Sequence, residues 1–233
     1  MMPYFYYGYD SVLIIALLGV MVLGFIAQAS VNTTFKKYSA VRSQSGMSAA
    51  NVAQKLLQNA GSSVQITRVG GALTDHFDPK NNIVGLSEAV YSSDSVAALA
   101  VGAHEIGHVM QYEEGYAPIR MRNAILPIAQ FGSSAAPFIV IGGMLFGSYD
   151  LAMIGVILFA AVFAFQMITL PVELNASSRA IEMLSAGGFL SYDETAGAKK
   201  VLRAASMTYV VATLSAALTL LRLLLIARGS RRR

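Results

Sequence analysis

Four long apolar stretches alternate with polar segments along this chain. They lie at 12–27, 124–146, 151–172 and about 204–227. With their flanking residues, they approach or reach the roughly 20 residues that a helix needs to cross a bilayer. A tight turn at 147–150 joins the second stretch to the third. The pattern predicts about four transmembrane helices, two of which form a hairpin.

The polar segments between these stretches carry the signals of a small α+β domain. A serine can cap a predicted helix over 48–60, and an aspartate can cap another over 94–113. The segments 64–69 and 83–87 have the pattern of short strands, with turn residues between them. The predicted fold class is therefore membrane α-helical, with about four transmembrane helices plus a small α+β domain.

Composition supports a membrane protein. The chain has 55% hydrophobic and 13% charged residues, whereas soluble domains carry about a quarter charged residues. Lys and Arg cluster beside the apolar stretches, as membrane-flanking charges do, so the net charge of +4 does not indicate nucleic-acid binding. The chain has no cysteine. A bound metal must therefore use His, Asp or Glu.

A His-Glu-x-x-His pattern lies on the predicted helix over 94–113 and consists of His104, Glu105 and His108. Positions i and i+4 share one face of a helix, so both imidazoles can bind the same tetrahedral Zn²⁺. Glu105 then lies beside the metal, where a carboxylate can take a proton from zinc-activated water during attack on a peptide carbonyl. The pattern favours zinc-dependent hydrolysis.

A catalytic zinc usually has three protein ligands and one open position. A metzincin would have Gly at position 111 and His at position 114, where this chain has Gln111 and Glu114, so that subclass is excluded. His76 and a downstream carboxylate remain as candidates for the third ligand. Among the carboxylates Glu173 stands out, because it directly follows the third apolar stretch.

Four sequence blocks resemble the YugP-type neutral zinc metallopeptidases of bacterial membranes, a gluzincin-like family distantly similar to HtpX-type and CAAX-prenyl endopeptidases. The blocks are LTDHFDP at 73–79, AHEIGH at 103–108, PIAQFG at 127–132 and LPVELNAS at 170–177. The resemblance covers nearly the whole chain. It implies that His104, His108 and Glu173 bind one Zn²⁺ per chain and that Glu105 activates water.

Ser177 departs from the more distant relatives, which tend to have an acidic residue four positions after the ligand Glu. With the family resemblance, the small α+β domain is predicted to be zincin-like. The predicted organisation is an N-terminal anchor (1–30), a zinc-binding catalytic segment (31–123), a transmembrane hairpin (124–172), a third-ligand helix with a connecting segment (173–203), a C-terminal transmembrane helix (204–227) and a basic tail (228–233).

Three further expectations concern residues near the predicted site. His76 lies in a turn-like Asp-His-Phe-Asp-Pro segment, where a structural role competes with a catalytic one, the stabilisation of the developing oxyanion. Arg179 can form an ion pair or hold a second carboxylate or the substrate. The strand over 83–87 precedes the predicted helix that carries the His-Glu-x-x-His pattern. The edge of this strand could bind an extended peptide by strand addition.

The predicted function is that of a membrane-anchored zinc metalloendopeptidase acting on misfolded or membrane-associated protein substrates. The alternative is a non-catalytic membrane chaperone or scaffold with a structural zinc site, which needs a fourth protein ligand such as His76. A transporter has less support, because no acidic residue lies between Asp150 and Glu173. The oligomeric state is left open.

Charge bias predicts the orientation of this multi-pass protein in the bacterial inner membrane. The hairpin returns the segments 31–123 and 173–203 to one side, and their excess of Lys and Arg predicts that this catalytic side is cytoplasmic. In that arrangement the basic tail at 228–233 lies across the membrane, which conflicts with the same rule. A fourth stretch that only dips into the bilayer would remove the conflict.

Overall fold

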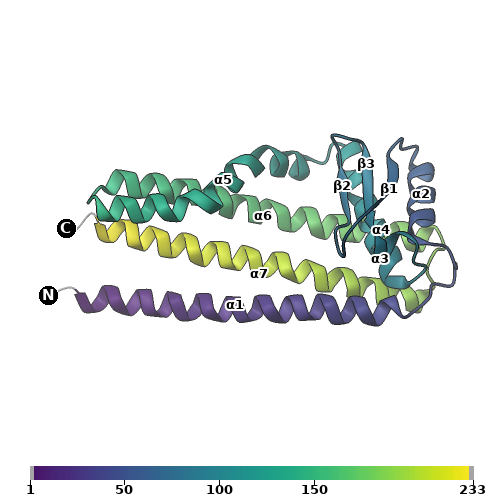
Figure 1. Cartoon of the computed structure of the whole chain (residues 1–233), viewed down its shortest axis with the longest axis horizontal. Coiled ribbons are helices and arrows are strands. Elements are labelled where there is room, and N and C mark those ends of the chain that lie inside the picture. The colour runs from purple at the N-terminus through teal and green to yellow at the C-terminus, as the bar shows by residue number, and fades with distance from the viewer. Residues whose placement is uncertain (1–2, 231–233) are drawn as a thin grey trace. The chain divides into compact units, whose positions relative to one another are not determined.

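The computed structural model describes residues 3–230, and the elements of this part are mostly helices with one small sheet (Figure 1). This confirms the predicted fold class. The elements are α1 (Pro3–Ser39), α2 (Ala49–Ala60), β1 (Gln65–Val69), β2 (His76–Asp78), β3 (Ile83–Ser87), α3 (Glu88–Tyr91), α4 (Val96–Glu113), α5 (Ala117–Leu145), α6 (Tyr149–Ala186) and α7 (Tyr192–Ser230).

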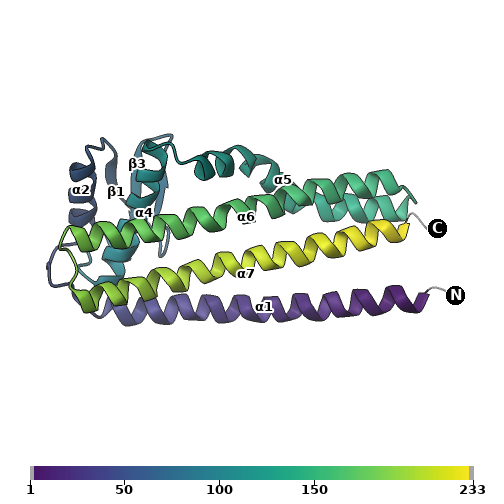
Figure 2. The same cartoon turned by 180° about the vertical axis from the view of Figure 1, so that it is seen from behind.

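Four helices in residues 3–230 are long and apolar enough to cross a membrane by length and composition. They are α1, α5, α6 and α7, and Figure 2 shows α1, α6 and α7 from behind. All four extend beyond the predicted apolar stretches. The apolar stretch marks only what lipid can cover, whereas backbone hydrogen bonds continue a helix through polar residues as well.

The chain forms two compact units. The helical unit contains residues up to 26, 118–171 and the residues from 208 onward. The sheet unit contains 27–117 and 172–207. The helices α1, α6 and α7 contribute to both units. The helix α6 continues without a break past Pro171. The segment 173–203, which was predicted to carry the third ligand, therefore does not begin a separate helix.

The sheet has the strand order β1-β3-β2, with β1 parallel and β2 antiparallel to β3. The proposal that the edge of strand 83–87 binds a peptide is wrong, because β3 is the central strand and both of its edges are paired. The segment predicted as a turn around His76 contains the strand β2. A strand of three residues that ends at a turn-forming aspartate is too short to show the alternating pattern of a strand.

Local signals place the helices of the sheet unit well. Ser48 caps α2 by accepting a hydrogen bond from the backbone N–H of Asn51, and Gly61 ends it in the left-handed conformation. The predicted cap of α4 is wrong by one residue. Ser95, not Asp94, accepts the hydrogen bond from Ala98 N–H at 3.2 Å, because the Asp94 carboxylate is paired with Arg42.

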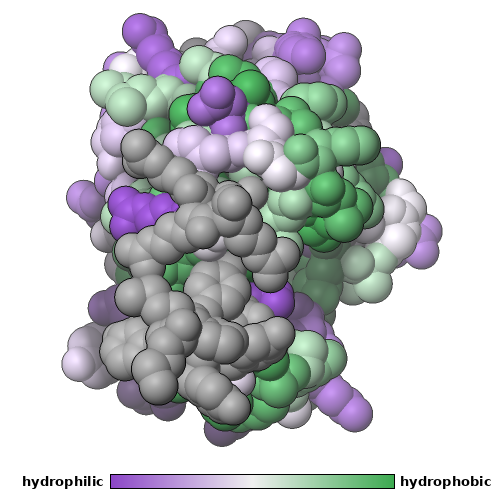
Figure 3. Space-filling model, turned by 90° about the vertical axis from the view of Figure 1, so that its left-hand side faces the viewer, coloured by the Kyte–Doolittle hydropathy of each residue, from purple (hydrophilic) through white to green (hydrophobic). Residues whose placement is uncertain are grey.

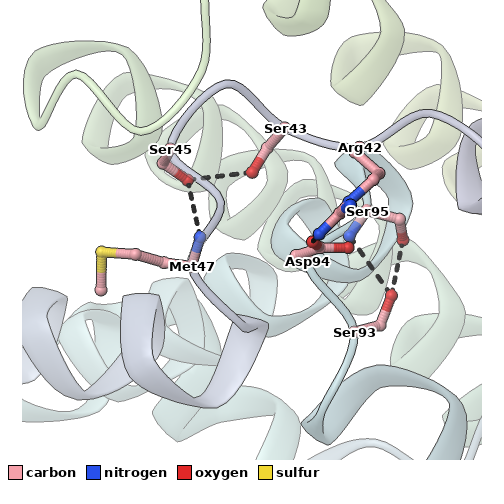
Figure 4. Close-up of polar contacts among 7 residues, drawn as sticks. All are labelled: Arg42, Ser43, Ser45, Met47, Ser93, Asp94 and Ser95. Atoms are coloured by element: carbon pink, nitrogen blue, oxygen red, sulfur yellow. Dashed lines mark hydrogen bonds and ion pairs between the residues drawn. The ribbon is translucent and has the colours of Figure 1, made fainter.

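Figure 4 shows the loop after α1 beside the start of α4. The Arg42 guanidinium donates to Asp94 Oδ2 at 2.6 and 2.8 Å. Backbone hydrogen bonds join the same loops, from Ser43 N–H to Asp94 O and from Val96 N–H to Val41 O, each at 2.9 Å. These contacts anchor the first turn of α4 to the end of α1.

The helical unit combines a narrow packed core with outward-facing apolar side chains. Ala136, Val140 and Ala152 in this core are fully buried. By contrast, Phe138, Leu145 and Phe146 are between 76% and 82% exposed. Broad hydrophobic areas are visible in Figure 3, which looks onto the left-hand end of Figure 1. Lipid tails are the solvent that accommodates such a surface.

Candidate metal centre

Three ligand atoms from α4 and α6 converge within the sheet unit. His104 and His108 lie one turn apart on α4, and Glu173 comes from α6. Glu173 Oε2 is 3.3 Å from His104 Nε2 and 3.5 Å from His108 Nε2. Zinc–nitrogen and zinc–oxygen bonds of about 2.1 Å imply about 3.4 Å between two ligand atoms of a tetrahedral site. Both distances from Glu173 thus match the spacing of a zinc site, and all three ligand atoms lie within 4.8 Å of one another.

The chemistry of this donor set also fits zinc. Two imidazoles with one carboxylate suit Zn²⁺, whereas Mg²⁺ and Ca²⁺ prefer oxygen ligands alone. The Glu173 side chain is 3% exposed, and those of His104 and His108 are 17% and 11% exposed. The free-energy cost of burying the Glu173 carboxylate is compensated when a cation lies between it and the two imidazoles. The predicted ligands are therefore brought together in an arrangement that can hold a metal ion.

Close packing of α4 against α6 makes this arrangement possible. A Cβ atom at Gly107 would lie 2.5 Å from the carbonyl oxygen of Ala176. Only glycine at this position lets the two backbones approach so closely. Gly107 lies between the two histidines, and Ala176 lies less than one turn after Glu173. The missing side chain thus brings the carboxylate within reach of the imidazoles.

Glu105 lies on α4 beside the cluster and is 7% exposed. Burial raises the pKa of its carboxyl above the ordinary value, and the charges of His104 and His108 oppose this rise. Burial alone would lower the pKa of His108, but its hydrogen bond to Glu173 and the charge of Glu105 give a net rise. The charges of these groups are therefore strongly coupled.

Both histidines make a hydrogen bond through the ring nitrogen that faces away from Glu173. His104 Nδ1 is 3.2 Å from the Ser177 hydroxyl. Ser177 thus contacts His104 from the position at which the distant relatives tend to have an acid. His108 Nδ1 is 3.0 Å from Gln111 Oε1. Such partners orient metal-binding imidazoles.

The contact between Gln111 and His108 was not predicted, because the sequence marked Gln111 only as a position where a metzincin has glycine. Its spacing of three residues from His108 on one helix is a signal that could have pointed to it. Its amide also donates to Asn175 Oδ1, and Arg179 Nε donates to the same oxygen. Arg179 pairs with Glu114 at 2.7 Å, as expected for an ion pair.

The structure does not bring His76 to the cluster. Phe77, its neighbour on β2, packs edge-on against Tyr112 of α4. Adjacent residues of a strand point to opposite faces, so His76 faces away from α4. Its ring lies over Gly85, and its Nδ1 atom is 2.8 Å from Thr74 O. The role of His76 in oxyanion stabilisation stays a prediction that no contact supports.

Comparisons with known proteins agree with this geometry. The family described as "Putative neutral zinc metallopeptidase" matches residues 13–228. The "Putative membrane protease YugP" of Bacillus subtilis (strain 168) is 44% identical over 220 residues, which cover 94% of this chain and 96% of the relative. No solved structure matches the chain significantly. The chain therefore belongs to this family of neutral zinc metallopeptidases.

Proposed function

We propose that this protein is a zinc-dependent metalloendopeptidase of the cell membrane, with Glu105 as general base. The observation that carries the proposal is the convergence of His104, His108 and Glu173, whose ligand atoms lie within 4.8 Å of one another, with Glu173 Oε2 at 3.3 and 3.5 Å from the two Nε2 atoms. The relative's printed name, a membrane protease, and the four candidate spans support the membrane setting. One Zn²⁺ per chain is expected, because residues 3–230 contain one cluster of three such ligands.

The chain's own residues divide the work between metal binding and proton transfer. His104, His108 and Glu173 would hold the ion, and three protein ligands are the number at which a catalytic zinc keeps its fourth position for water. A zinc ion held there supplies Lewis acidity, which activates water and polarises a peptide carbonyl. The Glu105 carboxylate takes a proton from the attacking water and returns it to the leaving amine nitrogen.

The alternative, a non-catalytic chaperone or scaffold, needs a closed site with four protein ligands. Among residues 3–230, the cluster of His, Asp and Glu side chains that can hold a metal contains three members and excludes His76. No observation favours this alternative. X-ray absorption of the zinc protein would revive it by showing four protein ligands and no water.

The decisive experiment measures zinc content and casein cleavage on the same detergent-purified samples. Glu105→Gln should keep zinc and lose about 10²- to 10⁴-fold in cleavage rate, the usual effect of a general base. Glu173→Ala should lose zinc and activity together. Glu182→Gln and Glu182→Ala, at an exposed glutamate of the same helix α6, are the matched controls. Full activity in Glu105→Gln would refute the mechanism.

We propose misfolded or membrane-associated proteins as substrates. Support comes from the membrane-spanning helices that belong to the same chain as the metal cluster. The test compares cleavage of one protein in its folded and unfolded forms with cleavage of a membrane protein in mixed micelles. Faster cleavage of the unfolded or membrane-bound substrate supports the proposal, and equal cleavage of the folded soluble form contradicts it.

We also propose that the catalytic side is cytoplasmic, in the inner membrane. Because the chain has no cysteine, single introduced cysteines report their location without background. Lys80→Cys labels the turn between β2 and β3, and Phe146→Cys labels the region between α5 and α6. In intact cells, a membrane-impermeant thiol reagent should modify Phe146→Cys and spare Lys80→Cys. The reverse pattern would place the metal cluster outside.

A further inference from the structure

We propose that Gln111 is a positioning residue of the metal centre, which holds His108 in the tautomer that binds zinc and couples this ligand to Glu173. The inference rests on the proposed zinc site and concerns a residue that is not one of its three ligands. Gln111 is fully buried on α4. Burying an amide is costly unless its oxygen and nitrogen both find hydrogen-bond partners.

The partners of Gln111 determine how its amide is oriented. The nitrogen Nε2 lies 2.8 Å from the backbone oxygen of Val172 and 2.9 Å from Asn175 Oδ1. Both partners accept hydrogen bonds, so only the NH₂ end of the amide can face them. The carbonyl oxygen Oε1 must therefore face His108, from whose Nδ1 atom it is 3.0 Å away.

This orientation favours one tautomer of His108. An amide oxygen accepts hydrogen bonds and donates none, so Gln111 stabilises the form with the proton on Nδ1. In that form Nε2 carries a lone pair, which a zinc ion between His108 and Glu173 Oε2 would accept. His104 differs in this respect, because its partner, the Ser177 hydroxyl, can either donate or accept. Of these two partners, only Gln111 favours one tautomer.

Gln111 also acts on a second ligand through the backbone. The carbonyl that accepts from Gln111 belongs to Val172, directly before Glu173. A single amide therefore contacts one ligand and the backbone next to another, across the interface between α4 and α6. Asn175 steadies this amide, because its Oδ1 atom accepts from Gln111 and from Arg179 Nε at once.

The network becomes weaker toward its outer end. Arg179 and its partner Glu114 have side chains that are 25% and 55% exposed, and ion pairs in water contribute little. We therefore expect the effect on zinc affinity to be largest for Gln111 and smaller for Asn175. Loss of a residue that orients a metal ligand typically costs 10- to 100-fold in metal affinity.

The test uses protein labelled with ¹⁵N-histidine, which gives few signals because the chain has three histidines. In the zinc-loaded wild type, the His108 Nδ1 proton should give the downfield ¹H signal of a hydrogen-bonded N–H. In Gln111→Met that signal should move upfield, and the Kd for zinc should rise about 10- to 100-fold. Gln54→Met, the same change at an exposed position of α2, should alter neither quantity.

Two results would overturn the inference. One is a His108 Nδ1 proton signal that is the same in wild type and in Gln111→Met, and the other is a Gln111→Met variant that keeps the wild-type Kd for zinc. Should Gln111→Met fail to fold, Asn175→Ala and the wild-type spectra decide the question. In Asn175→Ala the Nδ1 proton signal should stay downfield and the Kd should rise about two- to tenfold, the effect of one hydrogen bond. An unchanged Kd in that variant contradicts the network.

These measurements separate the inference from the proposed function. A wild-type protein that binds zinc, shows the downfield Nδ1 proton signal of His108 and cleaves no substrate would refute the peptidase and keep the role of Gln111. A wild-type protein that cleaves casein while its Gln111→Met variant binds zinc normally would support the peptidase and refute the role of Gln111.

Discussion

The two units of this protein bury apolar residues in opposite ways. In the sheet unit, large side chains such as Leu57, Leu99 and Ile106 are fully buried. In the helical unit, Phe138 and Leu145 are 76% and 79% exposed. The same residue types thus serve a water-excluding core in one unit and a lipid-facing surface in the other. An apolar stretch of sequence shows that its side chains are excluded from water. The fold decides whether these side chains contact other protein atoms or lipid.

The largest expected contrast comes from truncating a leucine in each unit. Leu57→Ala should destabilise the sheet unit by about 2–5 kcal/mol, because it leaves a cavity among packed neighbours. Leu145→Ala should change stability by less than about 0.5 kcal/mol, because its side chain contacts detergent or lipid in both states. Pulse proteolysis across a urea series in micelles measures both. Equal losses would contradict the contrast between the units.

Zinc removal should act on one unit alone. Zinc at about 100 times its Kd stabilises the state that binds it by about 2.7 kcal/mol. A chelator should therefore lower the unfolding midpoint of the sheet unit and leave that of the helical unit unchanged. Glu173→Ala should respond to the chelator in neither unit. A fall in the midpoint of the helical unit would show that zinc also holds that unit together.

Two glycines test helix packing in the two units separately. A Cβ at Gly107 meets Ala176, and a Cβ at Gly143 meets the backbone of Ala152. Each change to Ala should cost about 1–3 kcal/mol, but only Gly107→Ala should weaken zinc binding. The matched controls are Gly102→Ala and Gly142→Ala, where the space is ordinary or open.

Zinc titration and thermal unfolding of these four variants check the prediction. Zinc affinity reduced by Gly143→Ala, or retained in Gly107→Ala, would contradict the assignment of the metal centre to the sheet unit alone.

The smallest effect is expected at helix caps. Ser48 accepts from Asn51 N–H in α2, and Ser148 accepts from Leu151 N–H in α6. Ser48→Ala should lower the stability of the sheet unit by about 1 kcal/mol. Ser148→Ala should leave the unfolding midpoint of the sheet unit unchanged. Urea titration of the two variants separates the effects, and a shift in the sheet unit on changing Ser148 would contradict the independence of the units.

Features that depend on neighbours along the chain were predictable. The helix that carries His104, Glu105 and His108 follows from periodicity, and the i, i+4 spacing places both imidazoles on one face. The helix from Ser48 to Gly61 follows from cap preferences. Both predictions were confirmed because helical hydrogen bonds are local. The cap of α4 was off by one residue because a distant arginine, Arg42, pairs with Asp94.

Features that depend on contacts between distant segments were not predictable. Strand order is one of them, and the central position of β3 overturned the predicted peptide-binding edge. The three-residue strand β2 was taken for a turn, because it forms only by pairing with β3. Its register turns His76 away from α4, although the sequence had left His76 as a candidate zinc ligand or oxyanion stabiliser.

The amino-acid sequence by itself determined which residues avoid water, which helices can cross a membrane and which side chains have the chemistry to bind zinc. These properties are carried by residue type and by short-range spacing. Only the tertiary structure decided that Glu173 meets the two histidines, that Gly107 allows the approach, and that Gln111 orients His108. Gln111 and Val172 are 61 positions apart, and no local pattern records which of many distant partners a packed interface selects.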